Sequence, residues 1–254
     1  MADARRSEPY RVNATYSPNP EGEFAFSPNT DNSYIRRYYD LQEEATQVGA
    51  SAAIDFPYFY GRHGNLEVGF SEINKDRDSG MNRYTVNDPG DSCGADLTQN
   101  LDSIFNECRN ELNVSRITNG SDTYYATQSI SAYYFKTNWP LLKNVELTSG
   151  MRFERSVQNV DTLDQQSAQP IATKLTTEDW LPGNALTWRF LDKKMQVRLA
   201  YSETISRPDL RELSDTRWQD FETGFEINGN PNLKATVINS YDARWEWYYG
   251  RNEN

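Results

Sequence analysis

Hydrophobic and polar residues alternate along several stretches of this chain, and the clearest stretch covers residues 239–249. Asp242, Arg244 and Glu246 occupy one parity of this stretch. Successive side chains of a β-strand point to opposite faces of its sheet, so the pattern predicts a strand with one charged face and one aromatic face. The aromatic parity comprises Tyr241, Ala243, Trp245, Trp247 and Tyr249.

The same alternation predicts further strands, and in one of them Val197, Leu199 and Tyr201 share the apolar parity. Between residues 124 and 139 aromatic residues occur on both parities, so the pattern predicts a strand there without assigning its faces. The other predicted strands cover residues 10–16, 48–56, 66–70, 145–153, 186–190 and 195–201.

The connections after residue 56 are alternately short and long. Three long polar segments, at about 71–122, 155–179 and 203–238, separate the short turns. Successive turns of an antiparallel meander lie at opposite ends of the sheet, so all three long segments fall at one end. Short turns at one end and long outer loops at the other are typical of outer-membrane barrels. We therefore expect an all-β antiparallel meander of about 8–10 strands that forms part of a transmembrane β-barrel.

Composition narrows the possible partners. The chain has 254 residues, of which 37% are hydrophobic and 13% aromatic, and its mean hydropathy is −0.84. No stretch approaches the roughly 18 apolar residues of a spanning helix, but a spanning β-strand needs only about 10 alternating residues. The formal net charge of −11 argues against nucleic acid as a partner, because phosphate binding needs a basic surface. The aromatic faces fit either lipid contact or, alternatively, a secreted β-sandwich carbohydrate-binding module that stacks sugars on Tyr and Trp.

Cys93 and Cys108 lie in the first long segment, in a region rich in Asp, Asn and Gly. Two cysteines in one irregular segment favour a loop disulfide in an oxidising compartment, and the alternative is two free thiols. A short helix within 97–111 is also predicted, with Leu101, Ile104 and Phe105 on one stripe.

Other candidate sites give weaker signals. Four carboxylates would suit calcium, but they lack the EF-hand spacing, so a solvated acidic loop is the preferred interpretation. His63 is the only histidine and lies in a turn flanked by glycine, and no familiar catalytic or nucleotide-binding motif occurs. We therefore predict no enzymatic activity, no metal and no cofactor. The four carboxylates are Asp76, Asp78, Asp88 and Asp91.

Several segments resemble the barrel of TonB-dependent outer-membrane receptors. Arg-Pro-Asp-Leu-Arg-Glu-Leu at 207–213 and Asn-Gly-Asn-Pro-Asn-Leu-Lys at 228–234 match that family, as does Leu-Pro-Gly-Asn at 181–184. Gly-Met-Arg-Phe-Glu at 150–154 is similar to the repeated Gly-x-Arg-Tyr-Glu strand of the family. The likeness is dense from about residue 124 to the end of the chain.

The resemblance implies a barrel of about 22 strands filled by an N-terminal plug. Such a receptor lies in the bacterial outer membrane and imports a siderophore, cobalamin or oligosaccharide with energy delivered by TonB. The chain shows no plug and no TonB box, so we expect a fragment that folds as an open, curved sheet and does not transport alone.

Two sets of site residues follow from this interpretation. The third long segment would bind ligand at the outer mouth, although Arg207 and Glu212 would serve equally to tie the segment to the barrel wall, which is the role we favour. That ligand set is Arg207, Asp209, Arg211, Glu212 and Trp218. The residues expected to face outer-membrane lipid are Val197, Leu199, Tyr201, Tyr241, Trp245, Trp247 and Tyr249.

Overall fold

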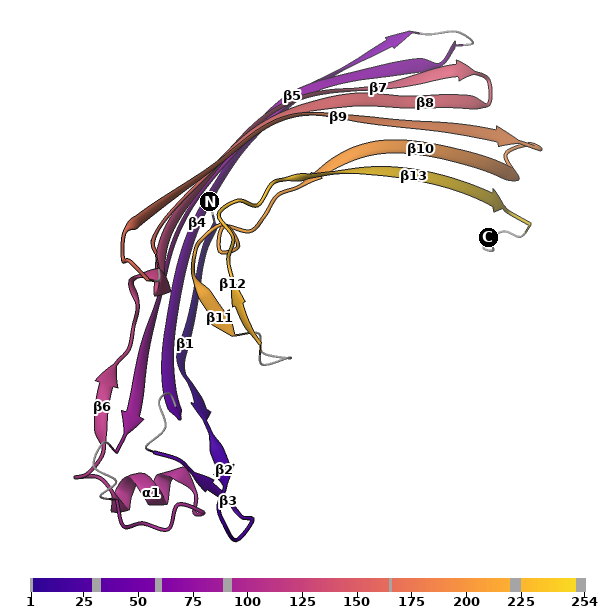
Figure 1. The fold of residues 1–254 in the computed structure, drawn as a ribbon. Helices are drawn as coiled ribbons and strands as arrows, with labels where there is room; N and C mark the ends of the chain where they lie inside the picture. The colour runs from indigo at the N-terminus through magenta and orange to yellow at the C-terminus, as the bar shows by residue number, and fades with distance from the viewer. Residues whose placement is uncertain are drawn as a thin grey trace.

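The computed structural model describes residues 2–28, 33–57, 61–88, 93–164, 166–219 and 225–249. Their main feature is one antiparallel sheet that curves strongly, which gives it a convex and a concave face (Figure 1). Eight of its nine strands follow one another in chain order, as β1, β4, β5, β7, β8, β9, β10 and β13, and β6 pairs with β5. The sheet is therefore a meander.

The strands of this sheet are β1 (Ala2–Ala14), β4 (Tyr34–Pro57), β5 (His63–Asn87), β6 (Asn113–Arg116), β7 (Thr123–Leu142), β8 (Val145–Leu163), β9 (Pro170–Phe190), β10 (Met195–Ser206) and β13 (Thr236–Trp247). Two small hairpins join β2 (Tyr16–Pro18) to β3 (Phe24–Phe26) and β11 (Arg217–Gln219) to β12 (Glu226–Asn228). The helical elements are α1 (Leu101–Glu107) and the 3-10 turn η2 (Gly120–Asp122).

The predicted fold class is confirmed, because the long strands form an all-antiparallel meander. The alternative of a two-layer β-sandwich is wrong. Among the described residues, the two sheets other than the main one contain only two strands each, so neither can cover its large apolar face.

Two of the predicted long loops contain long extensions of the neighbouring strands. β5 continues to Asn87, well into the segment 71–122, and β8 and β9 continue through most of 155–179. These two strands are joined at 164–169, where the carboxylate of Asp164 accepts hydrogen bonds from the backbone amides of Gln166 and Ser167. The prediction ended these strands where the alternation weakens, but the backbone ladder continues beyond that point.

The predicted disulfide between Cys93 and Cys108 is present, with Cα atoms 5.2 Å apart. The disulfide belongs to a small hydrophobic core beside the C-terminal end of β5, in which Phe26 and Ile104 are almost fully buried. The helix α1 supplies Ile104 and is preceded by its N-cap Asn100, whose side chain accepts a hydrogen bond from the amide of Ser103. The short predicted helix is thus confirmed inside the range 97–111.

Candidate functional site

The pairing register sorts the side chains of the sheet onto its two faces. We call a set of residues paired across neighbouring strands a rung. One rung contains Phe70, Tyr133, Phe153 and Trp180. A second rung, eight residues away along β8 and β9, contains Val145, Trp188, Val197 and Trp245. At about 3.3 Å per residue, the two rungs are roughly 26 Å apart along the strands.

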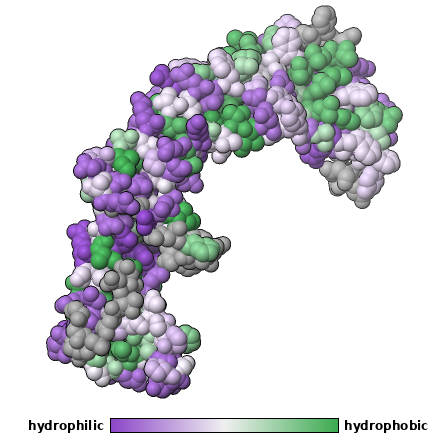
Figure 2. Space-filling view, viewed as in Figure 1, coloured by the Kyte–Doolittle hydropathy of each residue, from purple (hydrophilic) through white to green (hydrophobic). Residues whose placement is uncertain are grey.

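Both rungs lie on the convex face, because neighbouring residues of the opposite parity contact a loop on the concave face (Figure 1). We call the convex residues from one rung to the other the outward band. Its large apolar side chains are exposed, with Trp180 and Trp188 at 64% and 51%. Charged residues follow at once, since the next convex rung contains Glu72, Arg155 and Glu178. The largest hydrophobic patches of Figure 2 lie over the half of the sheet that holds the short turns.

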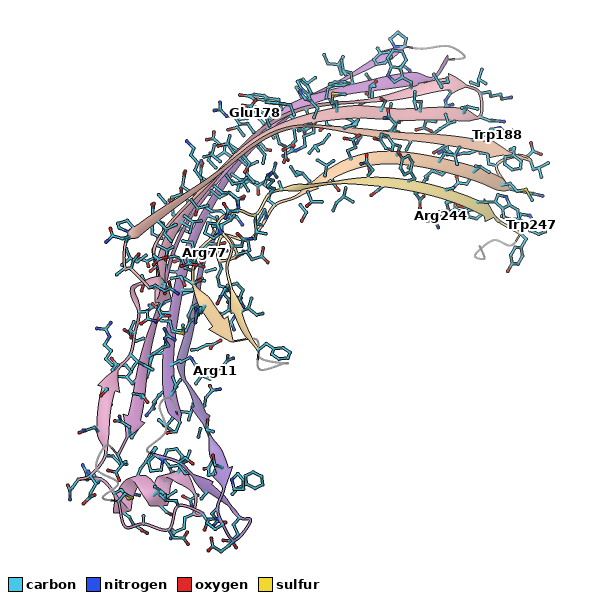
Figure 3. All side chains as sticks on the ribbon, in the orientation of Figure 1. Arg11, Arg77, Glu178, Trp188, Arg244 and Trp247 are labelled. Carbon is cyan, nitrogen blue, oxygen red and sulfur yellow. A yellow bond between two sulfur atoms is a disulfide. The ribbon has the colours of Figure 1, made fainter. Side chains whose placement is uncertain are left out.

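The seven residues predicted to face lipid all belong to β10, β13 or the residues that follow β13. The register pairs Val197 with Trp245 and Tyr201 with Tyr241, whose ring centroids are 4.9 Å apart. Leu199, Tyr241, Trp245, Trp247 and Tyr249 are each at least half exposed. Figure 3 shows Trp188 and Trp247 near the same end of the sheet.

The register also assigns the faces of β7, which the sequence pattern left open. Tyr133, Phe135 and Trp139 lie in the outward band and are exposed. Tyr124 and Tyr134 lie on the concave parity, where Tyr134 donates a hydrogen bond to the carboxylate of Glu67 at 2.9 Å. Aromatic residues therefore lie on both faces of this strand, which explains why the sequence pattern could not assign its faces.

The candidate ligand residues lie in the segment that follows β10 and folds back against the concave face. We call residues 207–219 of this segment the inner loop. It begins with one helical turn, in which the amides of Glu212 and Leu213 donate to the carbonyl of Asp209. The carboxylate of Asp209 accepts from the amide of Arg211, and the carboxylate of Glu212 accepts from the amide of Asp209. Such side-chain caps are what Asp and Glu supply at the start of a turn.

Two leucines anchor this turn to the sheet. Leu210 and Leu213 are 3% and 0% exposed and pack against Tyr124, Ala126 and Val160 on the concave face. Complete burial of a leucine side chain stabilises a structure by about 1.5–3 kcal/mol. Hydrophobic contact therefore holds the inner loop on the wall.

Ion pairs supply a second anchor at the end of β10. The guanidinium of Arg207 lies 2.9 Å from a carboxylate oxygen of Glu154 and 3.6 Å from one of Asp179. All three side chains are less than one fifth exposed, so solvent screens these pairs weakly. The contact joins the two segments 150–154 and 207–213 that resemble the receptor family.

A third anchor joins the turn to β5. Arg77 pairs with Glu43 of β4 and, at 2.9 Å, with the carboxylate of Asp209, and Figure 3 places Arg77 beside the inner loop. Partial burial works to raise the pKa of Asp209, but hydrogen bonds from the Arg211 amide and the Arg77 guanidinium outweigh it, so the pKa is below its usual value. Asp209 is therefore a charged member of the anchor.

Arg211 and Trp218 lie beyond these anchors. The guanidinium carbon of Arg211 lies 4.1 Å from the centroid of the Trp218 ring, a cation–π stack at the base of the β11–β12 hairpin. Gly229 closes the hairpin, and a Cβ there would meet the carbonyl oxygen of Ser214 at 1.9 Å, so only glycine fits. The hairpin extends into the concave space of the sheet (Figure 1).

The five candidate residues thus divide into two groups. Arg207, Asp209 and Glu212 hold the inner loop in place. Arg207 and Asp209 pair with charged side chains of the sheet, whereas Glu212 accepts a hydrogen bond within the turn and not from the wall as expected. Arg211 and Trp218 form a half-buried surface that faces the concave space. Sequence reasoning missed the wall partners, although Glu154 lies in the segment 150–154 that resembles the family and Arg77 lies between the calcium candidates Asp76 and Asp78. The missed partners are Glu43, Arg77, Glu154 and Asp179.

The acidic residues considered for calcium are distributed differently from the expectation of one loop. Asp76 and Asp78 lie on β5, and the buried carboxylate of Asp88 accepts a hydrogen bond from the amide of Cys93 at 2.7 Å. Asp91 lies outside the described residues. Within the part of the chain that the structure describes, no three His, Cys, Asp or Glu side chains gather to hold a metal, and no helix is long and apolar enough to span a membrane.

Comparison with known proteins identifies the family. The family model of TonB dependent receptor-like β-barrels matches residues 3–253. Among solved structures, the siderophore receptor PiuA from Acinetobacter baumannii has a similar fold, with a TM-score of 0.55 and 14% sequence identity over 91% of this chain. The chain spans about a third of that receptor, 34% of its length. No curated protein matches the chain. The match of the family model over nearly the whole length shows that this chain belongs to the TonB-dependent receptor β-barrel family.

Proposed function

We propose that this chain forms part of the wall and outer mouth of an outer-membrane receptor that imports a bulky nutrient. Receptors of this family lie in the outer membrane of Gram-negative bacteria and use TonB as their energy-coupling partner. The outward band supports a membrane position for this chain, because its two aromatic rungs, roughly 26 Å apart along the strands, are roughly 20 Å apart in height at the usual tilt of 35–45°, close to the apolar belt of about 25 Å of such barrels. The polar concave face would then line the passage.

The distribution of tryptophan is the observation on which the proposal rests. The chain has six Trp residues, and five of them are exposed on the convex face or at its end. A soluble protein rarely exposes a contiguous apolar surface of this kind, whereas a barrel places its aromatic residues at the lipid interfaces. The five are Trp139, Trp180, Trp188, Trp245 and Trp247.

Fluorescence quenching by brominated lipid tests this placement. Single-tryptophan variants of the 254-residue chain, folded into lipid vesicles, would retain only Trp188 or only Trp218. We expect bromine on the acyl chains to quench Trp188 strongly and to leave Trp218 of the inner loop nearly unchanged. Equal quenching of both residues, or a chain that stays soluble and monomeric without detergent, would overturn the membrane assignment.

The nutrient class is the finer part of the proposal. The resemblance to the family implies a siderophore, cobalamin or an oligosaccharide as the nutrient, and the structural neighbour is named as a siderophore receptor. We propose a siderophore first, with Arg211 and Trp218 as its contacts, because a guanidinium and an aromatic ring bind flat, anionic groups. Calorimetric titration of the folded chain with ferric siderophores tests this, and Trp218→Ala should weaken binding while Trp180→Ala, on the other face, should not. Because the sheet is open, we expect binding without transport by this chain alone.

A further inference from the structure

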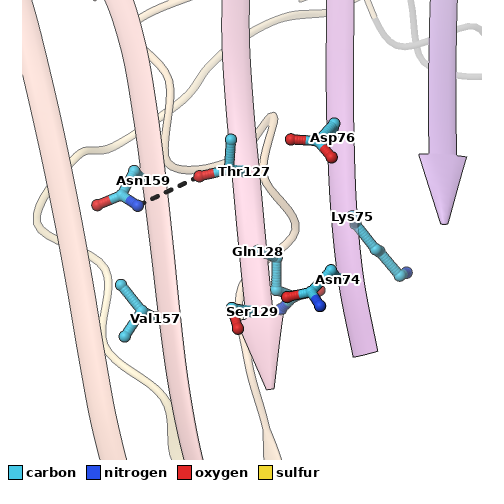
Figure 4. Close-up of a pocket in the computed structure, with 8 residues that line it drawn as sticks. All are labelled: Asn74, Lys75, Asp76, Thr127, Gln128, Ser129, Val157 and Asn159. Atoms are coloured by element: carbon cyan, nitrogen blue, oxygen red, sulfur yellow. Dashed lines mark hydrogen bonds between the residues drawn. The ribbon is translucent and has the colours of Figure 1, made fainter. Parts of the chain in front are cut away.

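A polar pocket lies on the convex face, away from the inner loop and the concave space. Its volume is about 270 Å³. Its convex side chains come from three neighbouring strands, β5, β7 and β8, and Figure 4 shows them around one hollow. They are Asn74, Asp76, Thr127, Ser129, Val157 and Asn159.

The height of the pocket above the outward band is defined by the register. Asn74 and Val157 lie four positions after Phe70 and Phe153 of the first rung, and Ser129 lies four positions before Tyr133 on the antiparallel strand β7. Four residues are about 13 Å of strand, or roughly 10 Å of height at the usual strand tilt of 35–45°. The polar interface adds only about 5–8 Å to each side of the hydrocarbon. A ligand in the pocket would therefore be a headgroup that extends well beyond the glycerol level.

The chemistry of the lining favours an uncharged, hydroxyl-rich ligand. The amide of Asn159 donates to the hydroxyl of Thr127 at 3.2 Å, and the amide of Asn74 donates to Glu72 at 3.3 Å. These bonds orient the two amide groups, and the register places Ser129 opposite Asn74, so its hydroxyl adds a further polar group to the lining. Val157, paired with Ser129 from the β8 side, supplies an apolar surface at the edge of the group. Amides, hydroxyls and a small apolar surface together suit a sugar ring, which offers hydroxyl groups at its edge and C–H groups on its face.

Charge argues against a phosphate in this place. On the convex face around the pocket, carboxylates at residues 72, 76, 78 and 161 outnumber the cations Arg155 and Lys174. Arg155 is already 3.4 Å from the carboxylate of Glu178. A phosphate would meet a net negative surface, whereas a neutral sugar would not.

We propose that this pocket binds one neutral sugar ring of a membrane glycolipid. The volume lies just below the range of about 300–1,000 Å³ that holds drug-sized ligands, so a single ring fits better than a whole nutrient. The inference rests on the proposed function only in using the outward band to set the height of the lipid headgroups. It adds to the receptor a lipid contact that is separate from the passage for nutrient.

Photo-crosslinking in micelles tests the proposal. The folded chain in phosphocholine micelles is doped with an octyl glucoside that has a diazirine on its sugar, and labelled peptides are mapped by mass spectrometry. We expect labelling concentrated on 125–129 and 157–159, and reduced about three- to tenfold by Asn159→Ala, which removes a hydrogen bond worth about 0.5–1.5 kcal/mol. Ser129→Trp should fill the pocket and abolish labelling. Asn113→Ala, an exposed residue of β6 far from the pocket, is the matched control and should change nothing.

Competition distinguishes the two sources of sugar. If unlabelled octyl glucoside competes and water-soluble methyl glucoside does not, the site takes its sugar from the membrane, as proposed. Equal competition by both would overturn the glycolipid assignment in favour of a soluble sugar. Labelling spread evenly around the outward band, or unchanged in both pocket variants, would overturn the site itself. The quenching of Trp188 by brominated lipid is measured on the same samples, so failure of the membrane assignment is detected separately from failure of the pocket.

Discussion

The strands β7, β8 and β9 carry their hydrophobic side chains on opposite faces in their two halves. Near the short turns, the apolar residues of β8 are convex, as at Val145 and Phe153, and their concave neighbour Glu154 is polar and ion-paired. Further along the same strand the order is reversed. Val160 is concave and fully buried under the inner loop, while Asn159 beside it is convex.

The reversal shows that each half of a strand meets a different environment. In the outward band the convex face has no protein cover, so its apolar residues suit lipid. Beyond the band, the inner loop covers the concave face of these strands and keeps it dry, so buried apolar residues such as Val160 lie on that face. The position of the hydrophobic side chains therefore marks where the proposed membrane region ends.

Removal of a buried leucine should give the largest effect. Leu213→Ala should cost about 2–5 kcal/mol, because it opens a cavity in the contact between the inner loop and the wall. Hydrogen exchange of the amides at 213 and 214 should then accelerate about 30-fold or more. The matched control is Leu191→Ala, since Leu191 is 62% exposed in a turn. Similar exchange in both variants would mean that the inner loop is not held by its leucines.

An arginine introduced on the convex face should destabilise the chain strongly inside the outward band and very little beyond it. Ile54 lies midway between the rungs, in register with Leu66, and is 68% exposed. Ile54→Arg should destabilise the chain in lipid by about 2–4 kcal/mol, as arginine does near the middle of a membrane barrel. Val114, 70% exposed on β6, is the control, and Val114→Arg should change stability by less than about 0.5 kcal/mol. Urea titration in vesicles measures both, and equal costs would contradict the lipid assignment.

The reversal also explains which parts of the fold could be predicted from the sequence. The alternation around Val145 and Trp245 predicts strands because convex and concave residues there differ sharply in polarity. From Ser156 onward the buried concave side chains are partly polar, such as Ser156 and Gln158, so the alternation weakens although the strand continues.

The candidate site could be predicted only in part, for a related reason. Composition and motif draw attention to the inner loop, but its anchors Glu43 and Arg77 come from strands more than a hundred residues earlier. Only the sheet register brings these side chains to the loop. The order of residues along the chain does not show which distant strands lie beside the inner loop.

Loss of the ion pair at the end of β10 should have an intermediate effect. Arg207→Gln leaves the largely buried carboxylates of Glu154 and Asp179 with fewer partners, which should cost about 1–3 kcal/mol. Arg5→Gln is the matched control, because Arg5 and Asp40 are more than half exposed and such pairs contribute about 0–1 kcal/mol. A double-mutant cycle with Glu154→Gln measures the coupling, and a coupling near zero would show that Arg207 acts on something other than Glu154.

The smallest effect should come from Asp209, and it should depend on pH. Because the pKa of Asp209 is lowered in the folded chain, its ionisation stabilises the inner loop above the unfolded pKa of about 3.9, and this contribution is lost as the pH falls through the folded value. The carboxylate is half exposed, so the contribution should stay below about 1 kcal/mol. Asp209→Asn should therefore speed hydrogen exchange in the inner loop less than fivefold at about pH 5, after correction for intrinsic rates, and the difference should disappear as the pH falls through the lowered pKa of the folded chain. If the difference persists at the lower pH, the charge of Asp209 does not link the inner loop to Arg77. The two buried leucines would then be the contacts that keep the inner loop on the concave face.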